Sequence, residues 1–348
     1  MKRVLVIKLT SMGDLMHALP ALTDAARAYP GISFDWVVDE AFAEVPSWHP
    51  AVANTFKSAH RRWRQQFFRA LGDGEFGNFY KQLNAEDYDV VIDAQNNVKS
   101  AFISLLRRGK VHGMDRDSVP ERPAHLAYAS RHAISRQQHA IARQRQLFAA
   151  ALEYALPGTT PDYGLKKGVF DMAGDMFGNP YIVLVHNASW TTKLWPEAHW
   201  HELIGMAGEA GYQVVLPGGS KAELDRAADL ARQHDNARAL PRKTLTELGG
   251  ILSRAEGVVS CDTGLAHLAA MTGTPTVTFY GPTSDKLIGT TGRNQVQLAA
   301  TAPPFACAPC YKRACRFEGS PAAMSSCMRA FTPLQAWEKL GTLLANPV

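Results

Sequence analysis

Long hydrophobic runs are absent from this sequence of 348 residues. A helix that crosses a bilayer needs about 18–20 consecutive apolar residues, and no stretch of the chain approaches that length. The first apolar stretch, residues 3–9, is interrupted by Lys8 and followed by Asp14, so it is too short for the core of a secretory signal peptide. We therefore expect neither a membrane span nor a signal peptide.

Cysteine is scarce, with five residues, an odd number for a long chain without a secretion signal. This usage favours reduced thiols in a cytoplasmic protein over a disulfide framework. Four of the five lie close together in the sequence and could bind a thiophilic metal, namely Cys307, Cys310, Cys315 and Cys327. Only the first two form a Cys-x2-Cys pair, so the spacing lacks the two such pairs that are typical of structural zinc sites. Packed, reduced thiols are the simpler interpretation, and we expect no metal and no cofactor.

Acidic residues are too few in the first half of the chain to balance its basic ones. Residues 1–150 hold 20 of the 37 basic and 15 of the 32 acidic residues, so the whole net charge of +5 lies there. Within 99–145, ten basic residues accompany three acidic ones. This half is expected to meet an anionic partner. Neither a nucleic-acid-binding motif nor a Walker A sequence is present, so we expect no nucleic acid and no P-loop enzyme.

Short apolar runs alternate with helix-compatible segments in both halves. The expected strands are 3–9, 32–38, 88–94 and 111–114 in the first half, and 181–187, 212–218, 257–262 and 275–281 in the second. Apolar strands that alternate with helices indicate buried parallel sheets. The segment 155–168, rich in Pro and Gly, separates the halves. We expect an α/β protein with domains at 1–160 and 161–330, followed by a C-terminal helix at 331–348.

Parallel sheets bind ligands beyond the carboxyl ends of their strands, so residues that follow strands are the candidates for chemistry. After the first strand, Thr10, Ser11 and Gly13 make a tight turn, and Asp14 stands near the start of the next helix. Asp14 is either an acid favoured at a helix start by the macrodipole or a general base that takes a proton from an attacking hydroxyl.

The strongest motif is VVSCDTGLAHLAAMTGTP at 258–275, where a buried strand runs into Asp262, Thr263 and Gly264 and then into a helix that carries His267. Backbone N–H groups at such a helix start favour a phosphate or diphosphate, and Gly264 permits close approach. Asp262 is then expected to be free to accept hydrogen bonds from sugar hydroxyls. The simpler alternative is an ordinary helix cap with a core histidine.

Two further segments follow expected strands of the second half. After 181–187, Ser189 offers a hydroxyl, and Lys193 offers a positive charge that would stabilise a departing phosphate. After 212–218, Glu223 lies on the helix that follows a Gly-Gly turn, where a carboxylate can hold a ribose. A solvated helix surface explains Glu223 equally well.

A basic and aromatic segment, HRRWRQQFFRAL, occupies residues 60–71. Arg61, Arg62 and Arg64 surround Trp63 in it. Such a segment can lie on an anionic membrane surface or bind phosphates and carboxylates. An exposed helix whose aromatic side chains enter the core is the alternative.

These segments together resemble a known family. KLTSMGDLMHALPALTDA, RRWR, YDVVIDAQNNVKSA, VHGMDRDSVPER, K-x-WPEAHW and VSCDTGLAHLAA, in this order, resemble the ADP-heptose glycosyltransferases that build lipopolysaccharide. The resemblance implies a GT-B fold, in which a Rossmann-like N-terminal domain binds the acceptor and a Rossmann-like C-terminal domain binds the nucleotide sugar. It also implies transfer of L-glycero-D-manno-heptose from ADP-heptose to Kdo2-lipid A, with inversion and without a required metal.

The resemblance assigns roles to individual residues. Asp14 matches the general base of the family, and Lys193 would stabilise the leaving group. The donor-site motifs are matched by Ser189, Lys193, Glu223, Asp262, Thr263, Gly264 and His267. The acceptor-side motifs are matched by Arg61, Arg62, Arg64, Gln95, Lys99 and Arg122. The lipid acceptor implies peripheral contact with the cytoplasmic face of the inner membrane.

Three alternatives remain open from the sequence. The cysteine-containing segments ACAPCYKRACRFEG and CMRAFTP resemble the branch of the family that adds the second heptose, to an acceptor that already carries the first. A sugar-nucleotide epimerase can share the two-domain fold without a glycolipid acceptor. A non-catalytic binding protein on the same scaffold would not need Asp14.

Overall fold

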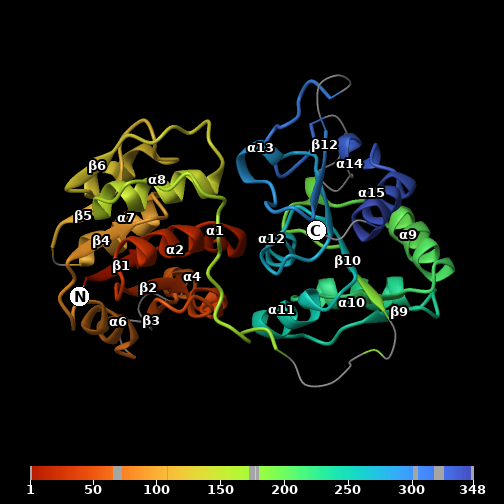
Figure 1. The fold of residues 1–348 in the computed structure, drawn as a ribbon, viewed down its shortest axis with the longest axis horizontal. Coiled ribbons are helices and arrows are strands. Elements are labelled where there is room, and N and C mark those ends of the chain that lie inside the picture. The colour runs from red at the N-terminus through yellow and green to blue at the C-terminus, as the bar shows by residue number, and fades with distance from the viewer. Residues whose placement is uncertain are drawn as a thin grey trace. The chain divides into compact units, whose positions relative to one another are not determined.

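The computed structural model describes residues 2–65, 73–107, 109–171, 177, 180–300, 305–316 and 325–345. The chain divides into two compact units, Met1–Val169 and Phe170–Val348 (Figure 1). Each unit is built around one parallel sheet with helices packed against it. None of the described helices is both long and apolar enough to cross a membrane.

The sheet of the first unit has six described strands in the order β3-β2-β1-β4-β5-β6. Their bounds are β1 Arg3–Ile7, β2 Ser33–Asp39, β3 Val52–Ser58, β4 Val90–Asp93, β5 Val111–Met114 and β6 Ser130–His132. All pairings are parallel, and the central register sets Val4 beside Phe34 on one side and beside Val90 on the other. The chain builds outward from β1 to β3, then returns to the other side of β1 with β4.

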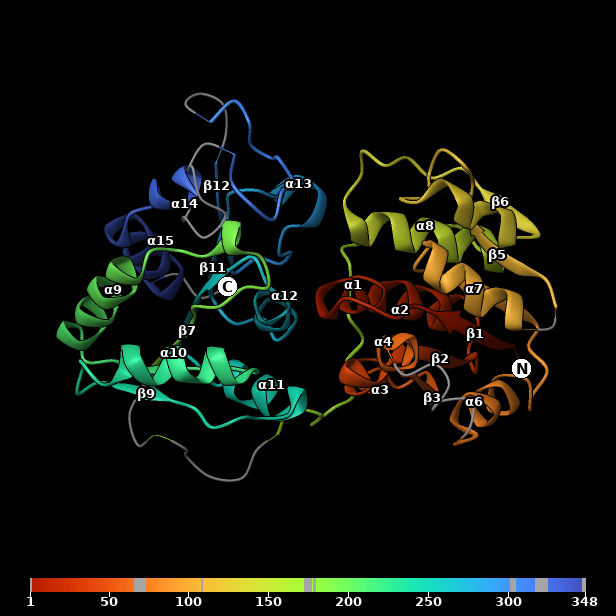
Figure 2. The same ribbon diagram turned by 180° about the vertical axis from the view of Figure 1, so that it is seen from behind.

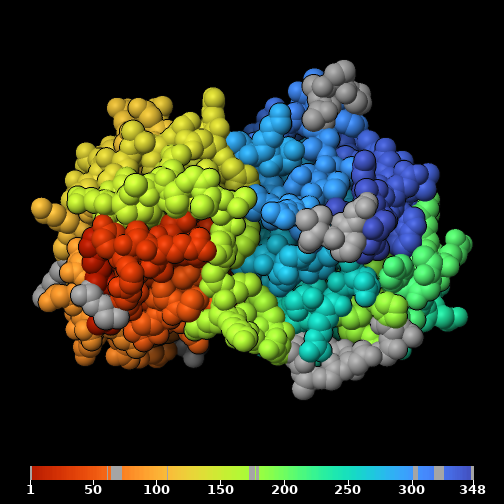
Figure 3. All heavy atoms as spheres, viewed as in Figure 1, coloured from red at the N-terminus to blue at the C-terminus, as the bar shows by residue number. Residues whose placement is uncertain are grey.

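The described helices of the first unit lie between these strands, except the last one, which follows β6. They are α1 Met12–Met16, α2 Leu19–Ala28, η1 Glu40–Phe42, α3 Glu44–Ser47, α4 His60–Gln65, α6 Glu75–Leu83, α7 Val98–Leu106, η2 Arg122–Ala127 and α8 Ala140–Leu152. The last of them, α8, packs against α2. In the space-filling view its yellow-green atoms lie beside the red atoms of α2 (Figure 3). The ion pair between Arg145 of α8 and Asp24 of α2 joins these two helices.

The sheet of the second unit repeats this plan, with described strands in the order β12-β11-β10-β7-β8-β9. Their bounds are β7 Tyr181–Val185, β8 Gln213–Leu216, β9 Ala237–Ala239, β10 Gly257–Cys261, β11 Thr276–Tyr280 and β12 Gln295–Ala299. The described helices are η3 Thr191–Lys193, α9 Glu197–Glu209, α10 Lys221–Ala231, α11 Leu245–Ser253, α12 Gly264–Met271, α13 Asp285–Ile288, α14 Ser326–Arg329 and α15 Pro333–Ala345.

The four strands expected in each half are present, and the two-sheet α/β prediction is confirmed. The structure adds β3, β6, β9 and β12, which are the edges of the two sheets. An edge strand is not enclosed on all sides, so it does not need a continuous apolar run. The exposed residues in β3 and the half-buried ones throughout β12 show this.

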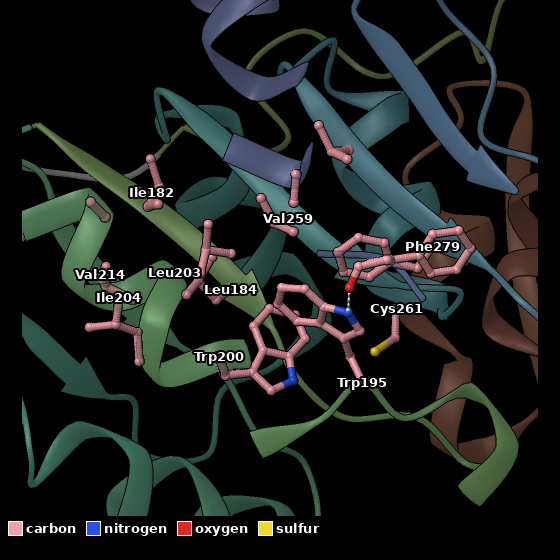
Figure 4. Close-up of a cluster of buried hydrophobic side chains, with 14 of the residues drawn as sticks. Ile182, Leu184, Trp195, Trp200, Leu203, Ile204, Val214, Val259, Cys261 and Phe279 are labelled. Atoms are coloured by element: carbon pink, nitrogen blue, oxygen red, sulfur yellow. Dashed lines mark hydrogen bonds between the residues drawn. The ribbon is translucent and has the colours of Figure 1, made fainter. Parts of the chain in front are cut away.

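The core of the second unit forms around Trp195, which is fully buried just after η3 (Figure 4). Its indole stacks on Phe279 of β11 with 4.6 Å between ring centroids, and it meets Trp200 of α9 edge-on. The indole Nε1–H donates to the carbonyl oxygen of Phe331 at 2.9 Å. Because the polar end of this large side chain is satisfied, burial fixes the end of the loop between β7 and α9.

Both sheets contain a switch point, where the direction of sheet growth reverses. In the first unit it lies between β1 and β4, and in the second between β7 and β10. The connections on the two sides of a switch point leave in opposite directions, which opens a crevice at the carboxyl ends of these strands. The segments that follow these four strands carry most of the sequence-predicted site residues.

Candidate functional site

The loop after β1 carries Asp14 in the first turn of α1. Its Oδ2 accepts hydrogen bonds from the backbone N–H of Ser11 at 2.9 Å and from the Ser11 hydroxyl at 2.6 Å. Among the described residues, Oδ1 has no hydrogen-bond partner. Asp14 therefore acts as a helix-start acid, which is one of the two roles that the sequence predicts, and the residue is half-buried with one carboxylate oxygen left for another partner.

Gln95, which follows β4, joins the two loops of this switch point. Its side-chain oxygen accepts from the backbone N–H groups of Leu9 and Thr10, both at 3.1 Å. The backbone of the Gln95 loop is held in turn by buried Asp93, which accepts from the N–H groups of Gln95 and Asn96. One amide side chain therefore fixes the loop that carries Asp14.

Lys8 is a charged group that the sequence analysis did not select. It is buried beside Asp14 and Asp93, and its Nζ donates to the carbonyl oxygen of Ala94 at 2.9 Å. Burial lowers the pKa of this ammonium, while attraction to the Asp14 and Asp93 carboxylates acts in the opposite direction. The signal for it in the sequence was a lysine inside an otherwise apolar strand segment, RVLVIKL.

The three arginines expected on the acceptor side fall in α4. Arg62 lies exposed between Glu75 and Glu40, at 2.7 Å and 3.0 Å, and these carboxylates raise its pKa. The side chains of Arg61 and Arg64 lie outside the described residues. Trp63 is buried against Phe76 and Phe79, so this aromatic enters the core as the alternative reading held.

Two further acceptor-side candidates, Lys99 and Arg122, are exposed. Lys99 lies in the first turn of α7, after β4, and Arg122 opens η2, after β5. The backbone N–H of Val98 donates to the Glu121 carboxylate at 2.9 Å, which joins the starts of these two elements. Both cations therefore lie near the carboxyl ends of adjacent strands.

In the second unit, Lys193 and Asp262 form a buried ion pair at the carboxyl ends of β7 and β10. The Lys193 Nζ lies 2.6 Å from Asp262 Oδ2, with the side chains 12% and 4% exposed. The Thr283 hydroxyl donates to the same oxygen at 2.6 Å, and His267 Nε2 lies 3.9 Å from Oδ1. A lysine and a threonine therefore occupy Oδ2 of Asp262. Acceptance of hydrogen bonds from sugar hydroxyls stays a prediction, and it falls to Oδ1.

The helix α12 begins beside this ion pair. Thr263 is its N-cap in extended conformation, and Gly264 is the first helical residue. The Thr263 hydroxyl is buried without a hydrogen-bond partner among the described residues. An unpartnered hydroxyl, the N–H groups of a helix start and a nearby lysine together form a site suited to a phosphate. His267 is buried on the same helix. Its neighbour is the Asp262 carboxylate, so it is not surrounded by apolar side chains alone, as a core histidine would be.

The remaining donor-side candidates lie on neighbouring loops. Ser189 is exposed between β7 and η3. Glu223 lies in the first turn of α10, where its Oε2 accepts from the N–H groups of Gly219 at 2.8 Å and Ser220 at 2.9 Å. Gly218 is required here, because a Cβ would lie 2.9 Å from the Glu223 backbone. Glu223 therefore serves as a helix cap in the structure, with its Oε1 left for other partners.

The segment 305–316, which carries three of the cysteines, supports the loop that carries Lys193. No pattern in the sequence indicated this role. The hydroxyls of Thr191 and Thr192 donate to the carbonyl oxygens of Arg313 and Lys312, at 2.9 and 2.7 Å. Cys307, Cys310, Cys315 and Cys327 are free thiols that line one cavity of about 670 Å³. Within the described part of the chain, no three His, Cys, Asp or Glu side chains are grouped as a metal site would require.

The chain is similar to proteins of one known family. Residues 76–320 match the model of glycosyltransferase family 9 (heptosyltransferase). The chain is 47% identical to lipopolysaccharide heptosyltransferase 1 of Pseudomonas aeruginosa, over 91% of this chain and 88% of that protein. It is 45% identical to lipopolysaccharide heptosyltransferase 1 of Escherichia coli K12, over 86% of this chain and 93% of that protein.

Solved structures give the same result. The E. coli heptosyltransferase WaaC with ADP has a TM-score of 0.81 and 44% identity, covering 86% of this chain and 93% of that one. The structure of WaaC with ADP-2-deoxy-2-fluoro heptose has a TM-score of 0.78 at the same identity and coverage. The E. coli ADP-heptose lps heptosyltransferase II, at 20% identity and a TM-score of 0.76 over 99% of both chains, shares the GT-B fold. The chain belongs to glycosyltransferase family 9, the heptosyltransferases.

Proposed function

We propose that the protein transfers L-glycero-D-manno-heptose from ADP-heptose to the Kdo sugar of Kdo2-lipid A, with inversion at the anomeric carbon. The observation that carries the donor half is the start of α12, where Lys193 and the unpartnered Thr263 hydroxyl lie beside helix N–H groups. A relative of 44% identity has been solved with ADP and with a fluorinated ADP-heptose. Relatives named lipopolysaccharide heptosyltransferase 1 support the acceptor half.

In the second unit, the diphosphate of the donor would lie at the start of α12. The N–H groups of Gly264 and the following residues, with the Thr263 hydroxyl, would donate to its oxygens. Lys193 remains close, and Asp262 fixes its ammonium in place. Glu223 and Ser189 are the candidates for the ribose and the sugar hydroxyls, and His267 Nε2 lies 3.9 Å from Oδ1 of Asp262.

In the first unit, Asp14 would act as the general base through its unoccupied Oδ1. Its other oxygen is held by Ser11, so the carboxylate is oriented before the acceptor arrives. The Kdo carboxylate and the lipid A phosphates are anions, for which Lys99, Arg122 and the α4 arginines are the candidates. The acceptor is a lipid, so the reaction is expected at a membrane surface, on the cytoplasmic face of the inner membrane.

The chemical step then balances without a further reactant. A Kdo hydroxyl gives its proton to Asp14, and its oxygen forms a bond to the anomeric carbon of heptose. The bond from that carbon to the diphosphate breaks, and ADP leaves with the electron pair. The helix start and Lys193 stabilise the negative charge that develops on the leaving diphosphate.

An assay of ADP release with ADP-heptose tests this proposal, with Kdo2-lipid A and heptosyl-Kdo2-lipid A compared as acceptors. We expect turnover on Kdo2-lipid A and little on the heptosylated form. Turnover on the heptosylated acceptor alone would assign the protein to the second transfer. Conversion of the nucleotide sugar without any acceptor would indicate an epimerase, and ADP-heptose binding without reaction would indicate a binding protein.

A further inference from the structure

One apolar area of the first unit lies exposed on α7 and η2, two elements that pack against each other. It consists of Val98, Phe102 and Leu105 from α7 and Leu126 from η2, which are 48%, 57%, 69% and 70% exposed. The three α7 residues are spaced i, i+4 and i+7, so they share one face of the helix. Ala101 and other residues of the opposite face are buried. We call these four side chains the α7–η2 surface.

This surface is unusual for the molecule. Among the described residues, eight large apolar side chains are exposed, and half of them, including the three most exposed, lie on α7 and η2. The others are scattered over other elements. Single exposed apolar residues need no explanation, whereas a group of them marks a place where water is excluded by a partner.

Basic side chains accompany the apolar ones. The described residues of 98–136 include seven basic and three acidic residues. Lys99 and Lys110 lie exposed in and just beyond α7, and Arg122 and Arg131 lie exposed in and just beyond η2. Arg131 also ties η2 to β6, because its Nε–H donates to the carbonyl oxygens of His125 and Tyr128. Figure 2 shows α7 in front of the sheet of its unit.

We propose that the α7–η2 surface docks the protein on an anionic lipid bilayer, with the apolar side chains among the acyl chains and the basic ones on lipid phosphates. Large apolar residues bordered by lysine and arginine are the arrangement that binds at a bilayer interface. A twofold contact between copies of the chain would instead bring the same basic residues face to face. Charge complementarity therefore selects an anionic lipid surface over a second copy.

The position of the surface fits a lipid acceptor. The helix α7 begins just after β4, and Gln95 joins that segment to the loop of Asp14. A bilayer under α7 would therefore be linked, through Gln95, to the loop of the general base proposed above. This inference rests on the proposed function only for the lipid nature of the acceptor, and its test uses vesicles that contain neither donor nor acceptor.

Sedimentation with vesicles of phosphatidylglycerol and phosphatidylethanolamine measures the docking. We expect the triple variant Phe102→Ser, Leu105→Ser, Leu126→Ser to lose about tenfold or more in vesicle affinity, because three large apolar contacts are removed. The matched control is Leu156→Ser, Leu334→Ser, which changes two exposed leucines elsewhere and should bind as the wild type does. Vesicles of phosphatidylcholine alone should bind the wild type more weakly, because they lack anionic charge.

A second variant keeps the test independent of folding defects. Phe102→Trp retains an apolar side chain, and its added emission should be quenched by vesicles with brominated acyl chains, beyond the quenching of the wild type. Equal vesicle binding by the triple variant and the wild type would overturn the proposal. So would a wild type that forms dimers, does not bind vesicles and becomes monomeric in the triple variant, because that result assigns the surface to a second copy.

Activity separates this inference from the proposed function. With Kdo2-lipid A embedded in vesicles, ADP release by the triple variant should fall about tenfold, while with detergent-dispersed acceptor it should match the wild type. Vesicle binding without turnover on any acceptor would refute the proposed function and leave the docking surface standing. Equal losses with embedded and dispersed acceptor would refute docking as the role of these side chains.

Discussion

Asp14 and Asp262 occupy comparable places in two sheets of the same design, each in the segment that leads from a switch-point strand into a helix. Their surroundings differ. Asp14 is half exposed, both of its hydrogen bonds go to Ser11, and one oxygen has no described hydrogen-bond partner. Asp262 is buried and is surrounded by Lys193, Thr283 and His267.

These surroundings decide what each carboxylate can do. A carboxylate with an open oxygen at the surface can accept a proton from a substrate. A buried carboxylate that already holds a lysine ammonium is neutralised in place, so its use is to fix that ammonium and to order the loop around it. The same residue type at the same point of the topology is therefore suited to chemistry in one unit and to positioning in the other.

Substitution of Asp14 should lower turnover more than any other change considered. Asn in this position can still accept hydrogen bonds from Ser11 but cannot accept a proton, so Asp14→Asn should lower turnover by about 10²–10⁴-fold. ADP affinity and the melting temperature should change little. ADP release and calorimetric ADP binding measure the two effects, with Asp117→Asn as an exposed control in the same unit. Turnover within a few-fold of wild type would remove Asp14 from the mechanism.

Breaking the ion pair between Lys193 and Asp262 should lower the free energy of unfolding. Lys193→Met leaves the Asp262 carboxylate buried without its cation, which is expected to cost about 3–5 kcal/mol in the free energy of unfolding. The double variant Lys193→Met, Asp262→Asn should regain most of that stability in urea unfolding, yet stay inactive in ADP release. In the exposed pair of Lys221 and Asp225, Lys221→Met should change little. A double variant as unstable as Lys193→Met would contradict a positioning role for Asp262.

Thr263 and Thr283 allow a ligand-binding hydroxyl to be compared with a structural one. The Thr263 hydroxyl has no hydrogen-bond partner among the described residues, so Thr263→Val should weaken ADP binding by about tenfold and leave stability unchanged. The Thr283 hydroxyl donates to Asp262, so Thr283→Val should lower stability instead. Calorimetric titration with ADP and urea unfolding of both variants give the comparison. Equal behaviour of the two variants would refute the assignment of Thr263 to the diphosphate.

The smallest expected effect is a pH dependence shared by both units. Burial lowers the pKa of His49 in the first unit and of His186 in the second to about 4. The unfolded chain binds protons below about pH 6.5, while the folded chain keeps these rings neutral until about pH 4, so stability falls as pH decreases through this window. At pH 5.5 each ring should contribute about 1 kcal/mol of destabilisation relative to pH 7.5.

Urea unfolding between pH 7.5 and pH 5 measures this slope. His49→Asn and His186→Asn should each make it shallower by a similar amount. His49 accepts from the Ala51 N–H through Nδ1 and meets the Thr23 hydroxyl through Nε2, so its neutral form is the one that the fold holds. An unchanged slope in both variants would show that other groups set the acid sensitivity.

The fold was predictable from the sequence where burial is complete on both faces of a strand. Continuous apolar runs such as YIVLV identified the central strands. Short edge strands such as Ser130–His132 could not be found, because their pairing is set by the neighbouring strand rather than by their own side chains.

The candidate site was predictable as a set of residues but not as a set of contacts. Motif and strand order brought Lys193, Asp262 and Thr263 to one place, as the sequence analysis expected. Pairing between Lys193 and Asp262 depends on residues 69 positions apart in the chain, which no local pattern reveals. The ion pairs of Arg62 with Glu40 and Glu75 could not be predicted either, because they depend on how α4 approaches η1 and α6.

Gln95 links the proposed docking surface to the proposed general base. Its side-chain oxygen holds two consecutive N–H groups of the loop that carries Asp14, while its own segment leads directly into α7. The docked helix α7 and the proposed base Asp14 are then linked through Gln95. The fold therefore sets the height of Asp14 above the bilayer. Only a hydroxyl presented at that height can reach the base, so the membrane plane itself contributes to the choice of acceptor.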